Sequence, residues 1–274
     1  MTPVILWLNK VFRRPNVGGR ESAEAYSRWE HHWGREFARL YMEPAGDLAG
    51  KRVLDVGCGL GGKTLAYAEA GAKATGTDIL EGNAVQSLDY AARHGTDVAF
   101  FVADAAALPV RDGAFDTVVA NDAMEHFAEP ERALAEMRRA LRTGGAIWVF
   151  FTPHYSPLGS HLYDYVYTPW CHLLFSRAQL ERAIRAVVKE RSASARNGDD
   201  VDVRVTAIMQ SYDRDLNHMS IQRFLGIVAR TPGLRVSNLE LKPAKFAALR
   251  PLTRVPGLRE LVTGFVTCRL ERVS

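Results

Sequence analysis

From about residue 50 onward, short apolar runs alternate with amphipathic stretches. This alternation is typical of a parallel sheet covered by helices on both faces. Five apolar runs before residue 152 are predicted to be buried strands: 52–56, 73–77, 98–102, 117–120 and 146–151. The stretches between them have helical periodicity. Three helices are predicted there: 63–70, 81–94, and one from Pro130 to just before Gly144 and Gly145.

The pattern changes after the fifth strand. Residues 152–175 combine three prolines with many aromatic and histidine side chains, so they do not continue the alternation of strand and helix. Ser176 and Gln179 form a capping box for a helix that extends to about Arg191. A polar loop is predicted at 197–200.

The two ends of the chain complete the predicted fold. A helix over 220–230 precedes two apolar runs, 234–241 and 265–270, which are expected to pair as antiparallel strands. Residues 1–50 form a helical lead-in that is rich in aromatic side chains, among them Tyr26, Trp29, Trp33, Phe37 and Tyr41. The pattern therefore predicts an α/β fold with a seven-stranded sheet that ends in an antiparallel hairpin.

Composition and charge narrow the function classes. The 274 residues are 47% hydrophobic and 24% charged, which is ordinary for a globular protein. The formal charge of +4 is concentrated at the ends, because residues 1–20 and 242–274 carry most of the excess Lys and Arg. The remaining part is net acidic. A nucleic-acid partner is therefore not expected, since such proteins carry a basic face on their main body.

The cysteines and the first residues indicate a cytoplasmic protein. Cys58, Cys171 and Cys268 are odd in number and lack the spacing of a zinc site, which favours a reducing compartment. The apolar run at 4–8 precedes its basic residues, the reverse of a signal peptide, and is too short to cross a bilayer. A short helix at a membrane surface stays open as an alternative to packing on the protein body.

A glycine-rich turn follows the first predicted strand. Gly57, Gly59 and Gly62 satisfy the GxGxxG spacing, in which missing side chains let a ligand lie against the backbone. Asp78, at the end of the second strand, is the acidic residue that a ribose needs. Both features also occur in NAD-binding proteins, so an NAD-dependent oxidoreductase is kept as an alternative.

The segments after the third and fourth strands separate these alternatives. Asp104 and Ala105, then 112–119, then 121–127, follow in an order that resembles class I S-adenosylmethionine-dependent methyltransferases. The similarity is to the small-molecule group that includes ubiquinone and menaquinone C-methyltransferases. It covers about residues 50–152, with a looser match over 220–274. The resemblance implies a Rossmann-like sheet with a terminal hairpin and S-adenosyl-L-methionine as cofactor.

The resemblance also implies a set of cofactor-binding residues. Asp55, Gly57, Cys58 and Gly59 match the positions that embrace the methionine part of the cofactor. Asp78 matches the residue that holds the ribose hydroxyls, and Ile79 the residue that flanks the adenine. Asp104 and Ala105 match the pair that recognises the adenine amino edge, and Asn121 matches the position near the methionine amine. Cys58 is expected to be a small buried residue, and Asp104 and Asn121 keep the alternative of local capping or turn roles.

Candidate bases should follow the fourth and fifth strands, because ligands gather at the carboxyl ends of parallel strands. His154 is favoured, since an imidazole with a pKa near neutrality suits a phenol or hydroxyl acceptor. Glu125 and His126 recur in the family as a structural element that begins a helix. The candidates are Asp122, Glu125, His126, His154 and Tyr155. No metal is expected, although His154, His161 and Asp164 could form a chance set.

The organisation predicts four parts: a helical lead-in or cap (1–50), the cofactor-binding core (51–152), an aromatic-rich lid insertion (153–218), and the last helix with the hairpin (219–274). The lid content suits an apolar or aromatic small molecule, methylated at O, N or C. Its aromatic surface equally suits a homodimer interface. The other readings are a membrane-surface quinone or lipid methyltransferase, with peripheral membrane contact, and a non-catalytic cofactor-binding module.

Overall fold

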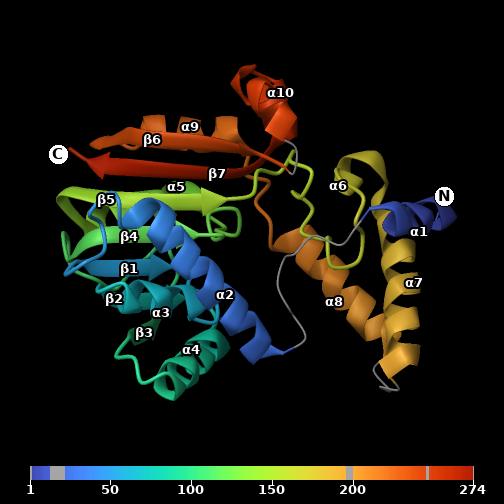
Figure 1. Cartoon of the computed structure of the whole chain (residues 1–274), viewed down its shortest axis with the longest axis horizontal. Helices are drawn as coiled ribbons and strands as arrows, with labels where there is room; N and C mark the ends of the chain where they lie inside the picture. Colours follow the sequence, from blue (N-terminus) through green and yellow to red (C-terminus); the bar gives the residue numbers. More distant parts are fainter. Residues whose placement is uncertain (1, 13–21, 196–199, 245–246, 274) are drawn as a thin grey trace. The chain divides into compact units, whose positions relative to one another are not determined.

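The computed structural model describes residues 2–12, 22–195, 200–244 and 247–273. The chain divides into two compact units. The sheet unit comprises the described parts of Gly18–Phe151, Gln222–Glu240 and Val266–Ser274. The insertion unit comprises the described parts of Met1–Val17, Thr152–Ile221 and Leu241–Phe265. Figure 1 labels the elements of both units.

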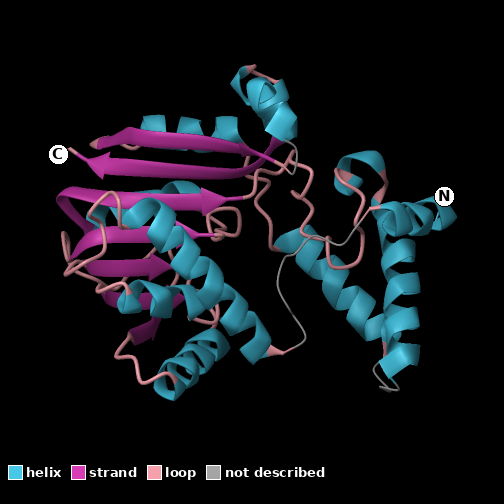
Figure 2. Ribbon diagram, viewed as in Figure 1, coloured by secondary structure: helices cyan, strands magenta, loops and turns pink. Residues whose placement is uncertain are grey.

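A seven-stranded sheet with the order β3-β2-β1-β4-β5-β7-β6 confirms the predicted fold (Figures 1 and 2). The first five strands pair in parallel, whereas β7 runs antiparallel to β5, with Ile147 opposite Leu270. β6 lies beside β7 at the edge. The strands are β1 (Arg52–Val56), β2 (Lys73–Asp78), β3 (Ala99–Val102), β4 (Phe115–Asn121), β5 (Leu141–Phe151), β6 (Leu234–Pro243) and β7 (Thr263–Arg272).

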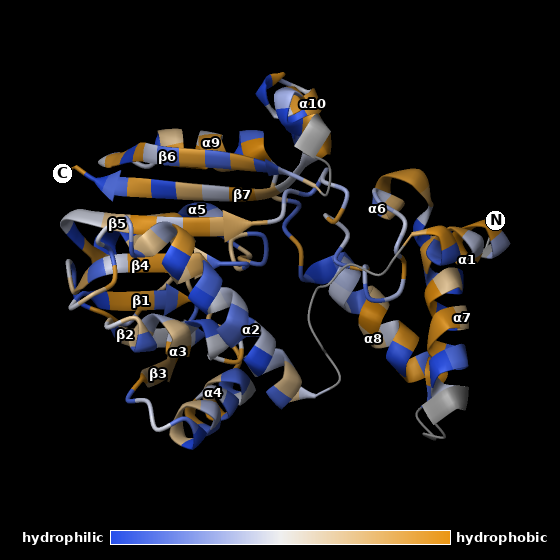
Figure 3. Cartoon of the chain, in the orientation of Figure 1, coloured by the Kyte–Doolittle hydropathy of each residue, from blue (hydrophilic) through white to orange (hydrophobic). Residues whose placement is uncertain are grey.

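Helices cover both faces of this sheet, as the apolar runs required. The side chains of a strand alternate between faces, so Phe150 packs near Phe37 of the helix α2, whereas Phe151 packs against Phe224 of α9. Figure 3 shows the apolar stretches of the central strands. The helical elements of the sheet unit are α2 (Ala23–Phe37), the π-helix η1 (Ala38–Met42), α3 (Gly62–Glu69), α4 (Glu81–Arg93), α5 (Pro130–Ala140) and α9 (Ile221–Arg230).

The end of α5 differs from the prediction. Gly144 and Gly145 were expected to mark the end of this helix, but they lie within β5. The helix ends at Ala140 because Leu141 already has extended backbone angles and pairs with Phe115.

The insertion unit has its own apolar core. Ile5 of α1, Leu180 and Ile184 of α7, and Val205 and Met209 of α8 are buried together. Ser176 donates its backbone N–H to the Gln179 side chain, which confirms that half of the predicted capping box. The helical elements of this unit are α1 (Thr2–Val11), α6 (Cys171–Leu174), α7 (Arg177–Ala195), α8 (Val201–Arg214), the 3-10 helix η2 (Ala247–Arg254) and α10 (Leu258–Val262).

Four of these elements were not predicted: α6, α8, η2 and α10. Residues 197–199 of the predicted polar loop lie outside the described residues. Asp200 is the N-cap of α8, and its side chain accepts hydrogen bonds from the backbone N–H groups of Asp202 and Val203. Among the described helices, none is long and apolar enough to cross a membrane.

Candidate functional site

The glycine turn lies directly after β1. Gly57 and Gly59 have positive φ angles, +73° and +57°. A Cβ atom on Gly57 would lie 2.7 Å from the Ala123 Cβ, and one on Gly59 would lie 2.6 Å from Oε1 of Glu30. Both the backbone conformation and the space therefore require glycine. Cys58 is 3% exposed and burial raises its thiol pKa well above the usual value, so it serves the turn as a small buried residue.

Asp78 ties the end of β2 to this turn. Its Oδ2 accepts a hydrogen bond from the backbone N–H of Gly59 at 3.0 Å. Its Oδ1 accepts from the Leu80 backbone N–H and from the Asn83 side chain, each at 3.0 Å. Carboxylate oxygens have several acceptor positions, so the side chain is held in place and can still accept further hydrogen bonds. The neighbouring Ile79 is 62% exposed.

Asp104 and Ala105 follow β3. Oδ1 of Asp104 accepts the backbone N–H of Ala106 at 2.9 Å, which is the local turn contact kept as the alternative reading. Ala105 is 8% exposed. The hydrogen bond uses one carboxylate oxygen, so the role of Asp104 toward the adenine edge stays a prediction.

A second carboxylate, Asp55, is buried beneath the turn. It is 1% exposed, and its Oδ2 accepts the Thr64 hydroxyl at 2.7 Å. Burial raises the pKa of Asp55 to about 6, although the Thr64 hydrogen bond and the Lys63 charge oppose that shift. The carboxyl is thus available to stabilise the turn and the start of α3.

Lys63 joins this region to the end of β4. Its Nζ donates to the backbone carbonyl of Asn121 at 2.9 Å and to Oδ2 of Asp122 at 2.7 Å. Burial alone would lower the Lys63 pKa, but the carboxylates of Asp122 and Glu30 outweigh it and raise that pKa. The Asn121 amide donates to the Tyr67 hydroxyl at 3.0 Å. Asn121, proposed from sequence near the methionine amine, is therefore held from both its backbone and its side chain.

Glu30 is the residue that sequence reasoning missed. It is 3% exposed, and its Oε2 accepts the backbone N–H of Gly62 at 3.3 Å. Burial raises its pKa to about 8, against the opposing charge of Lys63. The signal was present in the lead-in, because the buried side of α2 includes Ser27, Glu30, His31 and Gly34 at helical spacing.

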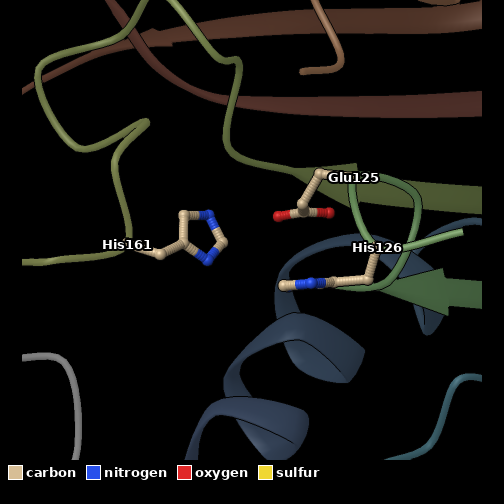
Figure 4. A group of neighbouring side chains, drawn as sticks. All are labelled: Glu125, His126 and His161. Carbon is tan, nitrogen blue, oxygen red and sulfur yellow. The ribbon is translucent and has the colours of Figure 1, made fainter. Parts of the chain in front are cut away.

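Two of the candidate bases, Glu125 and His126, lie on the loop after β4 (Figure 4). Glu125 is 2% exposed, whereas His126 is exposed and donates its backbone N–H to the Ala123 carbonyl at 2.9 Å. Figure 4 also draws His161, which belongs to the insertion unit.

Two further candidate bases, His154 and Tyr155, lie in the insertion unit. The ring of His154 lies 5.1 Å from that of His172 and 4.4 Å from that of His218. Nε2 of His172 donates to the backbone carbonyl of His154 at 2.6 Å. Tyr155 is 44% exposed and its ring lies 5.0 Å from that of His154.

The pKa of His154 differs from the sequence expectation. Burial and the two neighbouring imidazoles lower it to about 4 instead of leaving it near neutrality. Nδ1 of His154 is buried without a hydrogen-bond partner within the described residues. At neutral pH this side chain is therefore an uncharged imidazole with a free acceptor or donor nitrogen, and it is a weaker base than expected.

The strand order, the glycine turn after β1 and the acid at the end of β2 define an α/β protein that binds an adenosine-type cofactor. Comparison with known proteins makes the class specific. Residues 54–149 match the family model of the methyltransferase domain.

Two relatives illustrate the similarity. A demethylmenaquinone methyltransferase from Renibacterium salmoninarum is 30% identical over 221 residues, which are 76% of this chain and 85% of that protein. A ubiquinone biosynthesis O-methyltransferase from Bordetella bronchiseptica is 39% identical over 117 residues, 40% of this chain and 46% of that protein. The chain therefore belongs to the S-adenosylmethionine-dependent methyltransferases, which sets aside the NAD-dependent alternative.

Solved structures show the same fold. A methyltransferase from Thermotoga maritima, described as a possible histamine N-methyltransferase, has a TM-score of 0.51 at 17% identity and covers 92% of this chain and 96% of its own. Magnesium protoporphyrin IX methyltransferase from Synechocystis, solved with bound S-adenosylhomocysteine, has a TM-score of 0.52 at 16% identity and covers 93% and 89%. At these identities the likeness concerns the fold alone.

Proposed function

We propose that this methyltransferase modifies an apolar, quinone-related aromatic ring at carbon or at a ring hydroxyl. The observation that carries the proposal is the similarity to a demethylmenaquinone methyltransferase over 85% of that protein's length. The partial similarity to a ubiquinone O-methyltransferase supports the same acceptor class. An acceptor of this class is largely apolar with one or two polar positions on its ring.

The residues of the glycine turn fit S-adenosylmethionine. Glycine at positions 57 and 59 permits the positive φ angles of the turn after β1, where a ligand can lie against the backbone. Three hydrogen bonds already orient Asp78. We propose that its carboxylate accepts hydrogen bonds from both ribose hydroxyl groups. Ile79 is proposed to flank the adenine, and Asp104 and Ala105 to recognise its amino edge. Asn121 is proposed to lie near the methionine amine.

The chemistry is a displacement in which alignment and exclusion of water do most of the work. When bound, S-adenosylmethionine supplies an electrophilic methyl group on a sulfonium sulfur. The acceptor must lose a proton as its new bond to the methyl carbon forms, and the bond from that carbon to sulfur breaks. A neutral imidazole accepts such a proton. We assign this role to His154, with Asp122, Glu125, His126 and Tyr155 as the remaining candidates.

An acceptor panel tests the proposal. The purified protein is incubated with S-adenosylmethionine that carries a deuterated methyl group, and with a reduced naphthoquinone lacking the ring methyl, a catechol, or an aliphatic amine. We expect a labelled product from the naphthoquinol or the catechol, with fragmentation placing the label on ring carbon or ring oxygen. Methylation of the amine alone would contradict a quinone-related acceptor.

A second candidate is the same reaction carried out at a membrane surface. α1 buries Ile5 but exposes Val4, Trp7 and Val11, which are 48%, 60% and 56% exposed. An exposed apolar helix face next to a basic residue, here Lys10, is typical of interfacial binding. We expect sedimentation with anionic liposomes at low salt, and Trp7→Ser should reduce it several-fold. Lack of sedimentation of the unaltered protein would exclude this candidate.

A further inference from the structure

Glu30 comes from the N-terminal lead-in, yet its carboxyl group lies against the glycine turn. Oε1 of Glu30 is 2.6 Å from the place that a Cβ of Gly59 would occupy, while Oε2 accepts the N–H of Gly62. α2 is held close to this turn, since a Cβ on Gly62 would lie 2.2 Å from the Ser27 carbonyl oxygen. The helix therefore has little freedom to carry the carboxyl group away.

Among the described residues, Glu30 has no cationic side chain that pairs with it alone. Lys63 is the positive charge that acts on it, but the Lys63 ammonium group is already hydrogen-bonded to Asn121 and Asp122. Asp55 adds a second carboxyl group nearby. A buried carboxylate without a matched cation is unfavourable, and a positively charged ligand group would relieve that cost.

We propose that Glu30 is a cofactor-binding residue whose carboxylate binds the α-ammonium group at the methionine end of S-adenosylmethionine. The inference rests on cofactor binding at the glycine turn, and it is independent of the acceptor. The turn is where the methionine part is expected, and Oε1 occupies the side of Gly59 that the absent side chain leaves open. Asp78 contacts the same turn, because its carboxylate accepts the N–H of Gly59. The carboxyl groups of Glu30 and Asp78 therefore both lie against Gly59.

Binding through Glu30 should release a proton. In the free protein burial holds the Glu30 pKa near 8, so its carboxyl group is mainly protonated at pH 7. An ammonium ligand favours the carboxylate, which lowers that pKa and expels the proton. Of the other groups facing Glu30, Lys63 stays charged, Tyr67 and Cys58 stay neutral because their pKa values are raised, and Asp55, with a pKa of about 6, is already mainly ionised.

Calorimetric titration of the full chain with S-adenosylhomocysteine tests the proposal, because this ligand keeps the amino acid and lacks the sulfonium charge. Titrations at pH 7 in two buffers of different ionisation enthalpy count the protons. We expect the unaltered protein to release close to one proton per ligand bound. Glu30→Gln should abolish the release and weaken binding roughly tenfold to a hundredfold, as for the loss of a charge-assisted hydrogen bond.

Two controls separate direct binding from a structural effect. Glu36→Gln removes a partly exposed carboxylate of the same helix, paired with Arg39, and should keep both the affinity and the proton release. 5′-Methylthioadenosine lacks the amino acid, so it should bind the unaltered protein and Glu30→Gln equally and without releasing a proton.

Three outcomes would overturn the proposal. Binding of S-adenosylhomocysteine to the unaltered protein without proton release would refute Glu30 while leaving the cofactor site intact. Equal weakening of both ligands in Glu30→Gln would show a structural role only. Absence of any binding to the unaltered protein would refute the cofactor site and, with it, this inference. None of these results depends on the acceptor panel.

Discussion

The two units each bring together a cluster of titratable side chains, and the clusters differ in charge. The cluster of the sheet unit, Glu30, Asp55, Lys63 and Asp122, mixes carboxyl groups with an ammonium group. The cluster of the insertion unit, His154, His172 and His218, contains only imidazoles. In the first, Lys63 remains charged because carboxylates compensate its burial. In the second, burial lowers the pKa of both His154 and His172.

This difference fits two kinds of ligand. A region that already stabilises buried charges suits a zwitterionic amino-acid group, as at the methionine end of the cofactor. A region that keeps His154 and His172 neutral suits an apolar ring with a transferable proton. The same physical effect, the cost of burying charge, thus favours a charged ligand in one unit and an uncharged one in the other.

The largest expected effect concerns Lys63. Lys63→Met keeps the apolar stem but removes the ammonium group from Asp122 and the Asn121 carbonyl, so the free energy of unfolding should fall by about 3 kcal/mol. Urea denaturation measures it. Lys73→Met, at an exposed position of β2, is the matched control and should change the value by no more than about 0.5 kcal/mol. Equal effects of the two substitutions would mean that the cluster of the sheet unit is not held by its lysine.

The next effect concerns the histidine cluster. His154→Gln should lower kcat by about a hundredfold, as for the loss of a general base, and leave the Kd of S-adenosylhomocysteine unchanged. Steady-state kinetics and calorimetry measure the two quantities. His172→Gln alters the same cluster without removing the proposed base and should cost less activity. Similar losses in both variants would show that the cluster serves packing and not proton transfer.

Asp78 tests the charged side of the comparison. Asp78→Ala should weaken binding of S-adenosylhomocysteine by about 2 kcal/mol, because charged hydrogen bonds are lost. Asp89→Ala removes an exposed carboxylate of α4 that pairs with Arg93, and should leave the affinity unchanged. If calorimetry gives the Asp78 variant the affinity of the unaltered protein, Asp78 does not belong to the cofactor site.

The smallest effect is the pH dependence of the insertion unit. The folded protein lowers the pKa of His154 from 6.5 to about 4, so protonation favours the unfolded chain. Neutral His154 therefore contributes to the free energy of unfolding. This contribution is complete above pH 6.5 and decreases as the pH falls toward 4. Between pH 7 and pH 5 we expect His154→Gln to lose about 1.8 kcal/mol less unfolding free energy than the unaltered protein. Parallel pH curves for the two proteins would contradict the burial of a neutral His154.

Much of the sheet unit could be predicted because its signals are local. β1 occupies the predicted residues, and the remaining parallel strands differ from prediction mainly at their ends. Gly57 and Gly59 could be recognised because a turn with positive φ needs glycine wherever it occurs. In the insertion unit, by contrast, α8 was missed, since its apolar positions acquire meaning only through packing against α7.

The sequence by itself determined the class of protein: a parallel sheet, a glycine turn and an ordered series of acids at strand ends, which together mark a methyltransferase. Only the tertiary structure decided which ionisable groups are buried and with what charge. Glu30 lies about thirty positions from Gly59 and Gly62, and His154 meets His218 from across the insertion. A pKa depends on the surroundings that folding brings together, and neither the spacing nor the type of these residues contains that information.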